Sequence, residues 1–192
     1  MMKLIRRTVG VLFLAMVLVT PGPAQADTAN GWYMPTPSWD RQLQCDTQAT
    51  CPRFIVLSNW IDTSHPSGGA AVLDRETGLV WEQSPSTSQF TWENAQIHCM
   101  SLNAGNRGGW HLPTVQELRS LVDPSQSNPA LPAGHPFTGV QSSNYWSATT
   151  RAGFTDFAWS VNFFTGDVPP GDKSLISLFV WCVRGGQGID GV

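Results

Sequence analysis

The chain has 192 residues, and only 13% of them are charged, against roughly 25% in typical soluble domains. Nine Trp and nine Phe accompany this low charge, a composition that excludes a disordered chain or a coiled coil and predicts an aromatic-rich globule. The formal net charge of −3 argues against nucleic acid and anionic membrane surfaces as partners, because both are bound through Lys and Arg.

Residues 1–26 have the pattern of a cleavable secretory signal peptide. Three cations precede an apolar run over residues 9–19, and an A-x-A cleavage site follows at residues 24–26. The run is shorter than the about 20 residues that span a bilayer, so we expect no membrane insertion after cleavage. The mature chain has a net charge of −6 without the three signal cations, and we expect it in the periplasm, in the medium or at the cell surface.

The four cysteines predict two disulfides, because thiols of exported proteins are usually oxidised. Cys45 and Cys51 are close in sequence on either side of a polar stretch, and we pair them. Cys99 and Cys182 then form the second bond. Zinc is the alternative, but the spacings match no zinc finger and no C-x-x-C pair occurs.

Residues 27–69 are expected to form an N-terminal arm and a first strand. The arm shows no periodicity as far as Pro52, and the apolar run over residues 54–57 predicts the strand. Residues 71–73 and 79–81 flank a short loop that ends at Gly78, a residue that readily adopts a positive φ. This pattern predicts a β-hairpin.

Two short helices are predicted next. Apolar residues at positions 92, 95, 99 and 102 have helical spacing, and Thr91 is the expected N-cap. Thr114 and Glu117 form a capping box at the start of the second helix, which Asp123-Pro124 ends. A long loop over residues 125–143 precedes three expected strands, over residues 145–149, 156–164 and 175–184.

Five stretches, in this order along the chain, resemble the Lcl C-terminal domain family, named after the C-terminal domain of a bacterial collagen-like adhesin. They are VLDRETGLVWE at residues 72–82, WENAQIHC at 92–99, GWHLPTVQEL at 109–118, YWSAT at 145–149 and WCVRGG at 181–186. On this resemblance the domain covers residues 70–187, and residues 188–192 form a tail.

The resemblance implies an α+β, C-type-lectin-like fold, with two short helices packed on a small twisted antiparallel sheet. It also implies a disulfide from the first helix to the last strand, and surface adhesion or carbohydrate binding without catalysis. The chain lacks the namesake's collagen-like tract, so we expect a monomer. It also lacks the calcium signature of sugar-binding C-type lectins, and its acidity argues against sulfated glycans.

Six tryptophans are expected in the core, because strand alternation favours packing over sugar stacking. They are Trp81, Trp92, Trp110, Trp146, Trp159 and Trp181. Glu82 and Glu117 are the candidate carboxylates for glycoside hydrolysis, but the capping box accounts for Glu117 and no sequence feature raises the pKa of either. We therefore expect no enzymatic activity.

No cofactor is expected, and the His spacings match no metal motif. A structural calcium is the weak exception, because hard oxygen ligands suit this ion. Its candidate ligands are the loop carboxylates Asp123, Asp156, Asp167 and Asp172.

Residues 144–172 mix aromatic and adaptable polar side chains, as binding surfaces do, although an ordinary solvated surface is the alternative. The candidate ligand-binding residues are Tyr145, Arg151, Phe154, Asp156, Asn162 and Phe164, the last two facing outward. The sequence thus predicts a non-enzymatic domain that binds a glycan or a surface protein through its C-terminal sheet and loops. The alternative is an accessory subunit of an envelope or surface assembly, with the N-terminal arm as its contact.

Overall fold

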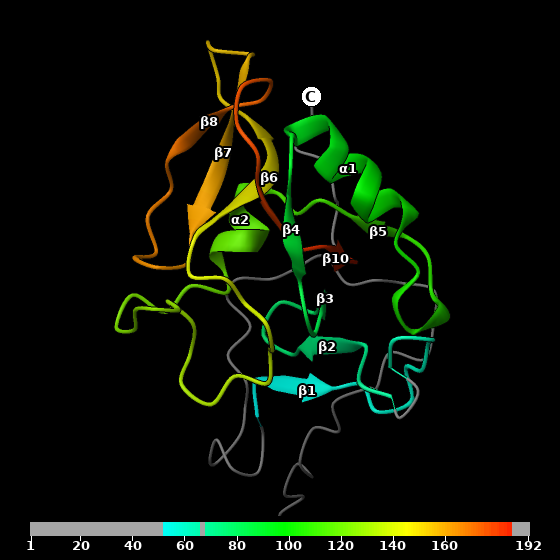
Figure 1. Cartoon of the computed structure of the whole chain (residues 1–192). Helices are drawn as coiled ribbons and strands as arrows, with labels where there is room; N and C mark the ends of the chain where they lie inside the picture. The colour runs from blue at the N-terminus through cyan, green and yellow to red at the C-terminus, as the bar shows by residue number, and fades with distance from the viewer. Residues whose placement is uncertain (1–51, 66–67, 186–192) are drawn as a thin grey trace, which may run out of the picture. The chain divides into compact units, whose positions relative to one another are not determined.

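A computed structural model describes residues 52–65 and 68–185, all of which belong to one structural unit (Figure 1). The predicted signal peptide, the Cys45–Cys51 bond, most of the N-terminal arm and the tail lie outside the described residues. The described residues form an α+β fold with two α-helices and two sheets.

The first sheet has five strands and is antiparallel throughout. In spatial order they are β1 (Phe54–Val56), β2 (Ala71–Asp74), β3 (Val80–Glu82), β10 (Val183–Arg184) and β5 (Trp110–His111). The predicted hairpin is confirmed as β2 and β3. Gly78 has a φ of 76° in its loop, and the Gly78 N–H donates to the carbonyl of Asp74 at 2.8 Å.

The second sheet also has five strands, and one of its pairs is parallel. In spatial order they are β4 (Ser86–Phe90), β9 (Leu178–Val180), β6 (Asn144–Thr150), β7 (Phe157–Asn162) and β8 (Pro170–Asp172). Strands β6 and β9 run parallel, with Tyr145 beside Phe179. The expectation of one small antiparallel sheet is therefore wrong, because two sheets of equal strand number share the core.

The two α-helices cover opposite faces of the second sheet. Helix α1 is Trp92–Ser101, helix α2 is Val115–Arg119, and a 3-10 turn spans Ala104–Asn106. Neighbouring residues on β6 point to opposite sides, so Trp146 packs with Cys99 of α1 while Tyr145 packs with Leu118 of α2. Helix α1 contacts β6, and α2 contacts β6 and β7, so both faces of β6 are covered along part of its length (Figure 1).

The predicted capping box at the start of α2 is confirmed. The Thr114 hydroxyl accepts from the Glu117 N–H at 3.2 Å, and a Glu117 carboxylate oxygen accepts from the Thr114 N–H at 2.8 Å. Thr91 occupies the N-cap position of α1, but its side chain makes no capping hydrogen bond. A helix as short as α2 depends on such a cap and on tertiary packing.

Substitution of Thr114 by Ala is expected to lower the free energy of unfolding by about 1–2 kcal/mol, because it leaves the buried Glu117 N–H without its acceptor. Urea denaturation at pH 7 would measure the change, with the exposed Thr87→Ala as the control. A midpoint for Thr114→Ala equal to that of the control would contradict this role.

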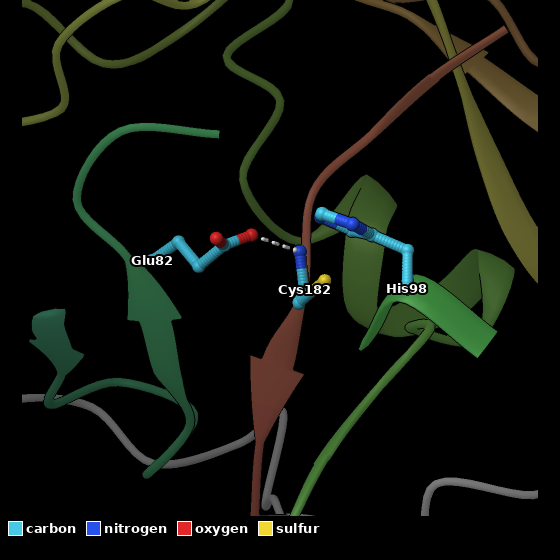
Figure 2. Close-up of side chains that lie close together, drawn as sticks. All are labelled: Glu82, His98 and Cys182. Carbon is cyan, nitrogen blue, oxygen red and sulfur yellow. Dashed lines mark hydrogen bonds between the residues drawn. The ribbon is translucent and has the colours of Figure 1, made fainter. Parts of the chain in front are cut away.

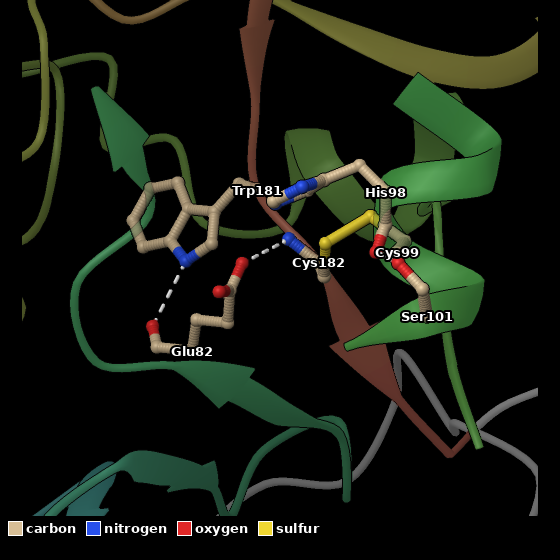
Figure 3. The surroundings of a disulfide bond; sticks show 6 residues. All are labelled: Glu82, His98, Cys99, Ser101, Trp181 and Cys182. Carbon is tan, nitrogen blue, oxygen red and sulfur yellow. Dashed lines mark hydrogen bonds between the residues drawn. A yellow bond between two sulfur atoms is a disulfide. The ribbon is translucent and has the colours of Figure 1, made fainter. Parts of the chain in front are cut away.

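The expected strand over residues 175–184 is two strands in two sheets. The chain leaves the second sheet after Val180 and joins the first at Val183, and Trp181 and Cys182 lie between them. The predicted Cys99–Cys182 bond is confirmed, and Figure 3 shows it between α1 and the last strand. It therefore links helix α1 to the segment that the two sheets share.

The tryptophans expected in the core occupy two kinds of place. Trp81, Trp110, Trp146 and Trp181 are buried. Trp92 and Trp159 are half-buried, and Trp92 packs against the edge of the core around α1, whereas Trp159 belongs to neither core cluster. Trp92 starts helix α1, where its ring lies 4.0 Å from the Nζ of Lys173, and Trp159 lies on β7 at the edge of the region covered by α2.

Candidate functional site

The six predicted ligand-binding residues lie in three separate places. Arg151, Phe154 and Asp156 belong to the turn between β6 and β7, and Asn162 and Phe164 lie at the other end of β7. Six strand residues separate the two ends, a distance of about 20 Å. Tyr145 is in neither group.

Tyr145 is fully buried, so its assignment to a binding surface is wrong. Its ring contacts Phe163, Phe179 and Trp181 at centroid distances of 5.3–5.8 Å. Its hydroxyl accepts a hydrogen bond from the Gln141 N–H at 2.7 Å, and burial raises the pKa of that hydroxyl to about 12. Tyr145 is therefore a core residue that orders the end of the long loop.

Asn162 and Phe164 belong to a tight turn after β7. The Asn162 side-chain oxygen accepts from the Phe164 N–H at 2.7 Å, and the Asn162 N–H donates to the carbonyl of Asp167 at 2.8 Å. The Phe164 side chain is 50% exposed. The Asn162 side chain thus stabilises the turn, and the Phe164 ring remains accessible.

A chain of cation–π contacts crosses the turn between β6 and β7. The guanidinium carbon of Arg151 lies 4.4 Å from the centroid of the Phe154 ring and 5.7 Å from that of Trp159. The Arg151 N–H donates to the carbonyl of Phe157 at 2.8 Å, which fixes the turn. Arg151 therefore connects an exposed aromatic ring with the half-buried indole of Trp159.

The ring of Trp159 lines a groove between β7 and α2, and we call it the Trp159 groove. It has a volume of 310 Å³ and is lined by Val115, Gln116, Arg119, Trp159 and Val168. The amide of Gln116 and the guanidinium of Arg119 lie on exposed residues of α2. An apolar wall with a few polar groups at its edge is typical of a small-molecule site.

Local structure positions the two sides of this groove. The capping box sets the start of α2, and the Val115 N–H donates to the Thr149 hydroxyl of β6 at 2.9 Å. On β7, Val161 points into the core from the same strand face as Trp159. Trp159 lies two residues before Val161, nearer the turn between β6 and β7. The short helix α2 does not cover it fully, so part of its ring stays exposed.

The candidate calcium ligands are not brought together. Among the described residues, the only group of three or more His, Cys, Asp or Glu side chains close enough to share a metal is Glu82, His98 and Cys182. The Cys182 sulfur is already bonded to Cys99, so this group is not a thiolate metal site. Of the candidate carboxylates, that of Asp172 instead accepts hydrogen bonds from Ser174, which hold its pKa below the usual value.

Glu82 and His98 lie on either side of the Cys182 backbone (Figure 2). A Glu82 carboxylate oxygen accepts from the Cys182 N–H at 2.8 Å, and burial raises the pKa of this carboxyl to about 7. Burial also lowers the pKa of His98. No sequence feature indicates this raised pKa, because the burial of the Glu82 carboxyl appears only in the tertiary structure.

Comparison with known proteins gives the family. The model of the Lcl C-terminal domain matches residues 70–184, more than half of the chain. The chain therefore belongs to the Lcl C-terminal domain family. No curated protein matches it. Within residues 52–65 and 68–185, no helix has both the length and the apolar character to cross a membrane.

Proposed function

We propose that this protein is an exported, adhesin-like domain that binds a glycan without catalysis, through the Trp159 groove and a C-type-lectin-like fold. The observation that carries the proposal is the half-buried indole of Trp159 in a groove of 310 Å³. Family membership supports a surface or adhesin-like role.

The groove offers the groups that a neutral sugar requires. The apolar face of a pyranose packs on an aromatic ring, and its hydroxyls need donors and acceptors at the edge of that ring. Gln116 supplies an amide, and Arg119 supplies guanidinium donors. Binding at one shallow groove would be weak, so useful adhesion would need several domains on one surface.

The disulfide supports export. The Cys99–Cys182 bond is buried, and such bonds persist in the oxidising space outside the cytoplasm. We propose cleavage after residue 26 and a location in the periplasm, in the medium or at the cell surface. An intact mass of the protein recovered from the envelope fraction would test this proposal, because cleavage at another place changes the mass.

Trp159→Ala is expected to reduce glycan binding at least roughly tenfold, the effect of losing a central aromatic contact. The purified, oxidised protein would first be applied to a glycan array, with calcium and again with a chelator, and hits would be titrated. Phe164→Ala, at the far end of β7, is the matched aromatic control and should bind as wild type. Arg119→Ala removes an exposed edge group and should weaken binding without unfolding the domain.

Three outcomes would contradict the proposal. Loss of binding with Phe164→Ala but not Trp159→Ala would move the site to the other end of β7. Loss of glycan binding in the presence of chelator would show that binding needs a metal ion, which the proposed site in the groove does not include. A blank array in both conditions would overturn glycan binding and favour a protein ligand.

A further inference from the structure

A second pocket lies beside β3 and the 3-10 turn. It shares no lining residue with the Trp159 groove. It has a volume of 630 Å³, within the roughly 300–1,000 Å³ typical of small-molecule sites. Its polar lining includes Asp62, His65, Glu82, Ser84, Asn103 and Asn106, and we call it the Glu82 pocket. Neither Lys nor Arg is among the described residues that line it.

Glu82 is the buried carboxyl of this pocket. Its side chain is 7% exposed, and one of its oxygens, Oε2, accepts from the Cys182 N–H. No described residue donates a hydrogen bond to the other oxygen, Oε1. Figure 3 shows the two oxygens pointing in different directions, with only one directed at Cys182. A buried carboxylate is stabilised in its ionised form by a donor or a cation beside it.

Asp62 is a second carboxylate in the lining, and it stays ionised. Although burial opposes this, hydrogen bonds from the Gly105 N–H and from His65 lower its pKa. The Gly105 N–H lies 2.7 Å from Oδ2, and the His65 ring lies 3.0 Å from Oδ1. The hydrogen bonds hold the Asp62 side chain in place, so the pocket has a fixed negative charge in addition to the Glu82 carboxyl.

We propose that the Glu82 pocket binds a protonated alkylamine, with the ammonium group at Oε1 of Glu82, the oxygen that the Cys182 N–H does not occupy. An ammonium carries three donors and one positive charge, and the pocket offers carboxylate, amide and hydroxyl acceptors without a resident Lys or Arg. A bare metal ion fits less well, because Asp62 does not join the group of ligands around Glu82. The acidity of the whole chain would also attract cations.

The ionisation of Glu82 gives this site a measurable signature. Burial raises the Glu82 pKa to about 7, and a bound ammonium would lower it again, so binding releases a proton near neutral pH. The other titratable groups near Glu82 are His98 on α1 and Tyr145 on β6, and Asp62 and His65 line the same pocket. Affinity should rise about tenfold from pH 6 to pH 8, as the carboxyl becomes ionised.

Isothermal titration calorimetry of the oxidised protein with 1,5-diaminopentane and with Nα-acetyl-lysinamide would test the proposal. Nα,Nε-diacetyl-lysinamide is the neutral control and should not bind. Runs in two buffers of different ionisation enthalpy would count the protons released. Tighter binding of the diamine would indicate a free polyamine as the source, and tighter binding of the lysine derivative a protein side chain.

Glu82→Gln keeps an acceptor for the Cys182 N–H and removes the charge, so it should lower affinity at least tenfold and abolish proton release. Glu93→Gln removes the same charge from an exposed position on α1 and should leave binding unchanged. No binding to wild type at pH 8, equal binding to both variants, or equal binding of the diacetylated control would each overturn the proposal. The inference does not depend on the glycan site, since Trp159→Ala should bind the amines as wild type does.

Discussion

Replacing Cys99 and Cys182 together by Ala is expected to lower the free energy of unfolding by about 4–5 kcal/mol. The bond joins residues 83 positions apart, and closing so long a loop removes much of the conformational entropy of the unfolded chain. Both residues are fully buried, so the double variant also loses packing in the core around α1. For a single domain, this is a large fraction of the total stability.

Urea denaturation of the oxidised wild type and of the double variant would measure this difference. Wild type unfolded and refolded in reductant is the second arm, and it should approach the stability of the variant. A loss below about 1 kcal/mol in both arms would show that the two sheets and the helices are stable without the bond.

Glu82→Gln is expected to stabilise the protein by about 3 kcal/mol at pH 8 and to have little effect at pH 4. The folded-state pKa of Glu82 is about 7, against 4.5 for the unfolded chain, because burial penalises the ionised form. Below pH 4.5 the Glu82 carboxyl is protonated in both the folded and the unfolded chain, so it does not lower the free energy of unfolding. As the pH rises towards 7 the unfolded chain releases the proton first, so the stability of wild type falls.

The difference between the two proteins isolates Glu82. Burial lowers the pKa of His98, so its contribution to stability is lost as the pH falls, in the opposite sense to that of Glu82. That contribution is present in wild type and in Glu82→Gln, and it largely cancels in their difference. Thermal or urea unfolding from pH 4 to pH 8 would give the curve, with Glu93→Gln as a flat control. A constant difference across this range would contradict the raised pKa.

The parts of the fold that the sequence predicts are those with local signals. The hairpin around Gly78 and the capping box of Thr114 and Glu117 involve residues a few positions apart, and both are present. Strand β4 is not predicted, because Ser86–Phe90 has mostly exposed polar residues and no alternation of apolar ones. Strand β8 begins at Pro170, a residue that argues against a strand.

The candidate site is predicted only in part, because alternation along a strand does not show what covers each face. Residues 144–150 contain a strand as predicted, but helices on both sides leave Tyr145 no solvent-facing side. Helix α2 stops covering the sheet near Trp159, so this residue, which the sequence assigns to the core, lines a groove instead. Glu82 follows two buried strand residues, and only the tertiary structure shows that its carboxyl is buried as well.

The position of the last two strands has a consequence for biosynthesis. Strand β10 lies between β3 and β5, and strand β9 lies between β4 and β6, so residues 178–184 complete both sheets. A ribosome delivers these residues after all the other described strands, and the nascent chain cannot form either sheet in full before they arrive. We therefore expect both sheets to close only after residue 184 has been synthesised. Cys182 belongs to the same segment, so Cys99 cannot form its native disulfide before that segment arrives.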